Sequence, residues 1–261
     1  MSWHGRTRAT YRSMPVGFVG AATSTTRLVR RWVSRPIDGE PRPRTDPVVP
    51  AEVVWPVSRV ETCAGIEGPG ELSFSSVLEA RRSHREMRLA PMREIVNAVA
   101  FAVRPRAVLK EDEFRRSRRP SPSAGAIHPV EILLVREARV FRYEALGHEL
   151  QVLRVSRRTS LRRFAQDCKE ILPKAAGTAL VLAGDGKRVD AMYERPSSLL
   201  WRDAGVLLQT LALVATAYGL AFSPLGILGG SLVDSIGLAG EVRAAGVALV
   251  GYPQREAGGA V

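Results

Sequence analysis

The chain has 261 residues, enough for one large or two small domains, and 45% of them are aliphatic, aromatic or cysteine, so most of it can fold. Its formal net charge of +12 could suggest nucleic-acid binding, but arginine is spread along the whole length. No zinc-finger spacing, RNA-binding aromatic signature or basic heptad region accompanies the charge. We therefore expect no specific nucleic-acid partner, and a solvated basic surface that could also meet an anionic ligand or acidic partner.

The spacing of cysteine and histidine argues against two further classes of protein, disulfide-stabilised and metal-binding proteins. Cys63 and Cys168 form no Cys-x-x-Cys motif, and the four histidines share no ligand spacing, so we expect neither a disulfide framework nor a metal site. No apolar run approaches the length of a membrane span. A short apolar stretch at 14–22 faintly resembles a signal peptide, but proline and glycine interrupt it. These features are typical of a cytoplasmic protein without membrane contact.

The first quarter of the chain differs from the rest. Residues 1–58 are rich in Arg, Pro, Thr and Ser, and their many proline-containing pairs argue against regular structure. We predict a disordered or extended N-terminal arm over residues 1–58, which could wrap a partner subunit. A folded domain is expected over residues 59–261.

Hydrophobic periodicity then predicts alternating helices and strands. Ser73 is a plausible cap for a helix at 73–82, and residues 91–103 predict a second helix, followed by a charged loop at 104–119. The next elements are an antiparallel meander, an amphipathic helix and a core strand that ends at a Gly-Asp-Gly turn. They are expected at residues 130–136, 140–143, 150–153, 160–172 and 178–183.

The segment Leu199–Leu220 predicts the longest helix. Its apolar residues cover more than one face, so it must be buried in a core or in a subunit interface, and Gly219 should end it. A loop at 222–230, a short helix at 232–236 and a last strand at 247–253 complete the expected order.

The loop before the strand at 130–136 is the most distinctive segment. Pro120 and Pro122 stiffen its backbone, and four small residues follow at 123–126. Small side chains allow another molecule or another backbone to approach exposed N–H groups. A rigid loop of this kind can hold a flat or phosphorylated ligand, although an ordinary tight loop would look the same.

Four separated segments resemble one family. The run Arg81-Arg82-Ser83-His84-Arg85 resembles the Arg-Arg-Ser-x-Arg element that opens nitroreductase-fold flavoproteins. Arg119–Glu131 is similar to the Pro-Ser-Ala-Gly-Ala-x-x-Pro-x-Glu loop of their SagB-type branch. Tyr193–Gly226 resembles the branch's long interface helix with its Pro-Leu-Gly loop, and Val247–Pro253 resembles its closing strand. In that branch, FMN-dependent dehydrogenases oxidise azoline rings of ribosomal peptides to thiazoles and oxazoles.

This resemblance covers roughly residues 70–255 and implies the fold and the assembly. The implied fold is α+β, with a central, mostly antiparallel sheet flanked by helices. The implied assembly is an obligate homodimer with two FMN sites built across the subunit interface.

The Arg-Arg-Ser element would hold the FMN phosphate. Guanidinium groups match phosphate oxygens bidentately, so Arg81 and Arg85 would supply cations and Ser83 a hydroxyl, while Arg82 could also point elsewhere. The structural alternative is an Arg-rich helix end that is stabilised by the helix dipole.

The flavin ring would meet backbone N–H groups, because reduction places negative charge at its polar edge. A simple type II turn is the structural alternative for the Pro-Leu-Gly motif. The implied ring contacts are Pro122, Ser123, Ala124, Gly125, Pro224, Leu225 and Gly226.

Azoline oxidation also needs a group that takes a proton. The SagB-type branch associates a Lys-Tyr pair with that role, and this chain has Met192-Tyr193 at the corresponding position. Either Tyr193 works alone, or His128 or Glu194 substitutes, or azoline oxidation is not the reaction. A structural hydrogen bond is the alternative role for His128.

The expected function is an FMN-dependent oxidoreductase that dehydrogenates a peptide-derived, azoline-type natural-product intermediate. An NAD(P)H-dependent nitro or quinone reductase and a catalytically degenerate partner protein are the alternatives. Expected partners are a second copy of the chain, a peptide or small-molecule substrate, and a biosynthetic partner enzyme.

Overall fold

The computed structural model describes residues 39–254. The signal-like stretch at 14–22 and most of the predicted arm lie outside the described residues. The folded unit begins at Glu40.

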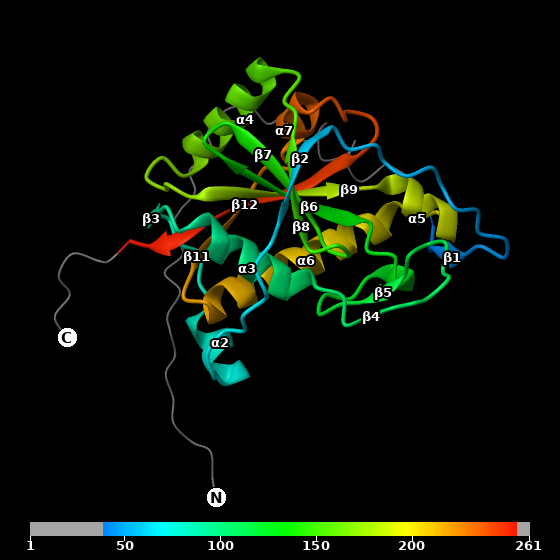
Figure 1. The fold of residues 1–261 in the computed structure, drawn as a ribbon, viewed down its shortest axis with the longest axis horizontal. Coiled ribbons are helices and arrows are strands. Elements are labelled where there is room, and N and C mark those ends of the chain that lie inside the picture. Colours follow the sequence, from blue (N-terminus) through cyan, green and yellow to red (C-terminus); the bar gives the residue numbers. More distant parts are fainter. Residues whose placement is uncertain (1–38, 255–261) are drawn as a thin grey trace, which may run out of the picture. The chain divides into compact units, whose positions relative to one another are not determined.

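The fold is organised by one antiparallel sheet (Figure 1). Its strands follow the order β11-β12-β9-β6-β7-β8-β2, and β3 pairs additionally with β12. The bounds are β2 Val57–Thr62, β3 Met87–Arg88, β6 Val130–Arg136, β7 Arg139–Glu144, β8 Glu149–Leu153, β9 Thr178–Gly184, β11 Ala221–Leu225 and β12 Arg243–Pro253. All pairings in this sheet are antiparallel, and the predicted meander is confirmed as β6-β7-β8.

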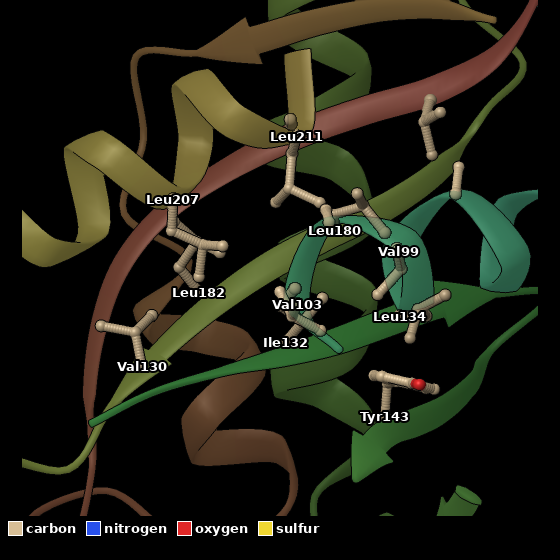
Figure 2. Packing of buried hydrophobic residues seen from close by; sticks show 14 of the residues in the cluster. Val99, Val103, Val130, Ile132, Leu134, Tyr143, Leu180, Leu182, Leu207 and Leu211 are labelled. Atoms are coloured by element: carbon tan, nitrogen blue, oxygen red, sulfur yellow. The ribbon is translucent and has the colours of Figure 1, made fainter. Parts of the chain in front are cut away.

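Helices cover both faces of the sheet (Figure 1). Helices α3 (Met92–Val103) and α6 (Ser197–Ala217) pack on one face, and α4 (Arg158–Ile171) and α7 (Gly230–Ser235) pack on the other. Side chains alternate along each strand, so Ile132 and Leu134 join the α3–α6 core while Leu133 joins the α4–α7 core. Figure 2 shows the α3–α6 core, with Val99 and Leu211 near the strands. This confirms the α+β fold class.

Helix α6 has about the length that the sequence predicts, but only the face toward α3 and the sheet is buried within the described chain. It ends in a Schellman motif, in which Gly219 (φ +66°) donates to Thr216 O at 3.0 Å and Leu220 donates to Ala215 O at 2.8 Å. By length and composition alone α6 could cross a membrane, but a core helix passes the same test. Because α6 contacts α3, β11 and β12, we interpret it as a core helix.

Several elements differ from the prediction. Residues 221–225 form strand β11 rather than part of a loop, and Pro224 is tolerated there because β11 is an edge strand. The predicted Gly-Asp-Gly turn leads into helix α5 (Gly186–Met192), since Asp185 caps it by accepting from the N–H of Lys187 at 3.0 Å. The charged loop contains the short strand pair β4 (Ala107–Val108) and β5 (Ser117–Arg118).

The predicted arm is also partly regular. Strand β1 (Arg42–Pro43) pairs with β10 (Tyr193–Glu194), and the N–H of Arg44 donates to Met192 O at 2.9 Å. The expectation from composition that regular structure is absent is therefore wrong at residues 42–43, while the disordered or extended arm over residues 1–58 stays a prediction. The pairing was hidden because its partner lies about 150 residues away in the sequence.

Candidate functional site

The small-residue loop packs directly against Tyr193. Gly125 has φ +61°, and a Cβ at this position would lie 3.0 Å from the Tyr193 hydroxyl and 3.6 Å from Met192 Cε. Both the backbone conformation and the close approach therefore require glycine. Strand pairing between β1 and β10 fixes the backbone of Tyr193 beside this loop.

A carboxylate of α6 holds the same loop in place. The Ser123 hydroxyl donates to Asp203 Oδ2 at 2.6 Å, and the Ala124 N–H donates to Asp203 Oδ1 at 3.3 Å. Burial raises the pKa of Asp203 above its ordinary value, although these two hydrogen bonds oppose the shift. The N–H groups of Ser123 and Gly125 have no acceptor among the described residues, so both are free donors of this loop.

Sequence reasoning missed Asp203. Its only signal is an acidic residue in the second turn of a largely apolar helix, and helical periodicity cannot indicate a partner about 80 residues away.

His128 also holds this loop, through hydrogen bonds to Ser117 and Ser123. Its Nε2 lies 2.7 Å from Ser117 O, and because a carbonyl oxygen only accepts, Nε2 carries the proton of the neutral ring. The His128 N–H also donates to Ser123 Oγ at 3.0 Å. Burial first, and the charge of Arg119 second, lower the pKa of His128 to about 4. A neutral ring at pH 7 that already uses its donor favours the structural role over acid–base catalysis.

This environment predicts an acid sensitivity. The ordinary pKa is 6.5, so between pH 6.5 and 4 the unfolded chain binds a proton that the folded chain does not. The free energy of unfolding should therefore fall as the pH falls through this window, by up to about 3 kcal/mol. Urea unfolding of wild type and His128→Asn at pH 7 and pH 4 measures the effect, because Asn tolerates the φ of 44° but does not titrate. Equal pH dependence in the two proteins would contradict it.

The Arg-Arg-Ser element lies at the start of β11. Arg81 ends α2 (Phe74–Ala80), and Ser83 forms an isolated bridge with Phe222. The His84 N–H donates to Phe222 O at 3.2 Å, which fixes the turn.

The arginine side chains of this element differ in their contacts. Arg82 Nε lies 3.4 Å from His84 Nε2, which favours the expectation that Arg82 points away from a ligand. The guanidinium groups of Arg81 and Arg85 have no hydrogen bond or ion pair within the described part of the chain.

The Pro-Leu-Gly motif follows the same strand. Pro224 is exposed and Leu225 is buried in the α4–α7 core, so Leu225 can offer only its backbone to a ligand. Gly226 is exposed, its φ is not positive, and a Cβ there would meet nothing within 4 Å. A type II turn would need a positive φ at this glycine, so that alternative does not hold. Neither backbone conformation nor packing within the chain requires glycine at this position.

The two motif groups lie at opposite ends of α6. Asp203, which holds the small-residue loop, is in the second turn of the helix, and Phe222, beside Ser83, follows its C-terminus. From Asp203 to Ala217 the helix rises by about 20 Å. Figure 1 shows β5 near one end of α6 and α2 near the other. One copy of the chain therefore does not bring the two groups together.

The sequence of the chain matches one known protein family. A sequence model described as the nitroreductase family matches residues 78–252. No curated protein sequence matches the chain.

Solved structures share the fold at low sequence identity. A protein assigned as a nitroreductase from Ralstonia eutropha is 16% identical, with a TM-score of 0.60 over 83% of this chain and 100% of that chain. A second, from Anabaena variabilis, is 21% identical, with a TM-score of 0.54 over 69% of this chain and 38% of that chain. A chain of the E. coli microcin synthetase McbBCD complex is 18% identical, with a TM-score of 0.53 over 92% of this chain and 85% of that chain.

Proposed function

We propose that this chain, which belongs to the nitroreductase family, is an FMN-dependent oxidoreductase that acts as a homodimer. The observation that carries the proposal is the separation of two motif groups that a single flavin site would need together. A second copy related by two-fold symmetry can bring the small-residue loop of one subunit to the Arg-Arg-Ser element of the other.

The surface of α6 supports such a pairing. Trp201 and Val206 are 43% and 39% exposed, although they are large apolar side chains on a long, largely apolar helix. Gly205 lies between them, and a Cβ there would meet nothing within 4 Å. A mid-helix glycine costs about 1 kcal/mol relative to alanine, so its presence favours close approach of another backbone. We propose that this partner is α6 of a second copy.

The donor set fits FMN. Arg81 and Arg85 are free to bind a phosphate dianion, and Ser83 adds a hydroxyl beside them. At the other end of α6, Gly125 offers a free N–H. Gly226, after strand β11, leaves room for a flat ring to approach its backbone. When bound, FMN supplies two-electron chemistry that no side chain of the protein can provide.

We propose that Tyr193, as its tyrosinate, takes the substrate proton and becomes the neutral phenol. Its hydroxyl lies against the small-residue loop, whereas Met192 beside it has no proton-accepting group. Pro122 has no N–H, and the Ser123 hydroxyl and the Ala124 N–H already bind Asp203, so of these three residues only Ser123 keeps a free backbone N–H for the ring.

The proposed substrate is a peptide-derived azoline, dehydrogenated by two electrons. The SagB-type loop supports this choice, and one similar fold belongs to a microcin synthetase solved with truncated pro-MccB17 bound. An NAD(P)H-dependent nitro or quinone reductase is the second candidate, which the replacement of the branch's lysine by Met192 favours. Incubation with azoline-containing peptides should give a two-dalton mass loss for the first candidate only.

Replacing Tyr193 by phenylalanine separates flavin binding from proton transfer. Tyr193→Phe keeps the ring that packs on Gly125 and removes only the hydroxyl, so the flavin content should stay at the wild-type level. Substrate oxidation should slow by about 100-fold or more, in the range typical of a lost general base. Single-turnover flavin reduction measures the step. Unchanged reduction would exclude Tyr193 as the proton acceptor.

A further inference from the structure

A second site lies on the opposite side of the sheet from α6. A cavity of about 630 Å³ is bounded by α4, the β6–β7 turn, the end of β8 and residues 173–179. None of the residues assigned to the flavin site lines it. The volume falls within the range of roughly 300–1,000 Å³ that is typical of small-molecule sites.

The floor of this cavity is apolar. Helix α4 contributes Leu161, Phe164 and Cys168, and the sheet contributes Leu153 and Leu249. All five are buried in the α4–α7 core, and burial raises the pKa of the Cys168 thiol to about 12, so it stays protonated. The bottom of the cavity therefore carries no charged group. This apolar surface favours a hydrocarbon chain over a charged ligand.

The rim of the cavity is basic. Arg158, Arg162 and Lys169 lie on the face of α4 that lines the cavity, and all are exposed. None of them forms an ion pair with a described residue. The rim has one acid, Glu137, whose Oε1 lies 3.9 Å from Arg136 Nε. Several cations above an apolar floor leave the cavity complementary to a molecule with one anionic end and one apolar end.

We propose that this cavity binds a free fatty acid, with its hydrocarbon chain between α4 and the sheet and its carboxylate at Arg158 and Arg162. The positive charge of the chain's own N-terminal segment argues against that segment as the occupant of the cavity. Residues 1–38 carry seven arginines and one aspartate, which would meet the basic rim with like charge.

The test uses full-length, FMN-loaded protein and 11-(dansylamino)undecanoic acid as a fluorescent probe. We expect saturable fluorescence enhancement that palmitate reverses, that hexadecan-1-ol reverses less well, and that excess FMN does not change. Ala165→Trp, which fills the cavity from an exposed position on α4, should abolish it.

Variants that remove arginine charges from the rim give a second test, which does not depend on Ala165→Trp. The double variant Arg158→Ala, Arg162→Ala should bind the probe up to about 30-fold more weakly, because each of the two exposed charges contributes up to about 1 kcal/mol and about 1.4 kcal/mol is a tenfold change. Arg163→Ala is the matched control, since Arg163 is exposed on the same helix but does not line the cavity. Lack of saturable binding, displacement by FMN, or equal weakening in the double variant and the control would overturn the proposal.

Discussion

Replacing both Arg81 and Arg85 by alanine is expected to weaken FMN binding by at least about 100-fold, because each charged hydrogen bond to phosphate contributes roughly 1.5–3 kcal/mol. Neither guanidinium has a protein partner in the described chain, so their loss should leave the fold intact. Flavin-to-protein ratio after gel filtration and titration of the apoprotein with FMN measure the effect.

Riboflavin provides the control for this variant. It has the same ring as FMN but no phosphate, so its affinity should be unchanged in the double variant. Arg93→Ala, an exposed arginine on α3, should bind FMN like wild type. If the double variant lost riboflavin and FMN affinity equally, or kept its flavin, the phosphate role of Arg81 and Arg85 would be wrong.

Gly226→Val should block docking of the flavin ring without destabilising the protein. A Cβ at Gly226 meets nothing within 4 Å and the φ is not positive, so the cost within the chain should stay within about 0.5 kcal/mol. The added side chain would occupy the space that we assign to the ring. We expect a colourless protein with an unchanged apoprotein melting temperature.

Gly230→Val is the matched control for Gly226→Val. Gly230 lies four residues downstream, its φ is not positive, and a Cβ there also meets nothing within 4 Å. This variant should stay yellow. A Gly226→Val protein that retains stoichiometric FMN would remove Gly226 from the site.

Local sequence signals predicted the interior of the fold well. Strand β6 has the predicted bounds, because a continuous apolar run flanked by turn residues fixes a buried strand. The end of α6 was predictable from Gly219, whose positive φ completes the Schellman motif. These features depend on residues that are near in sequence.

Features that depend on distant partners could not be predicted in this way. Strand β1 exists because it pairs with β10, and Pro224 occurs in a strand because β11 lies at the sheet edge. Asp203 holds the small-residue loop only because Ser123 lies beside it, and His128 is held by its hydrogen bond to Ser117 O. The sequence predicted the two motif groups, but not that α6 separates them.

A mixed-dimer experiment tests the shared flavin site most directly. Coexpressed, differently tagged subunits would carry the double substitution Arg81→Ala, Arg85→Ala in one copy and Gly125→Asn in the other, because Asn tolerates the φ of +61° but adds a side chain against Tyr193. Each homodimer of a variant should lack FMN. The mixed dimer should regain one FMN per dimer, because its second site combines the intact loop of one subunit with the intact arginines of the other. A mixed dimer without flavin, or a wild-type protein that binds FMN as a monomer, would contradict the account.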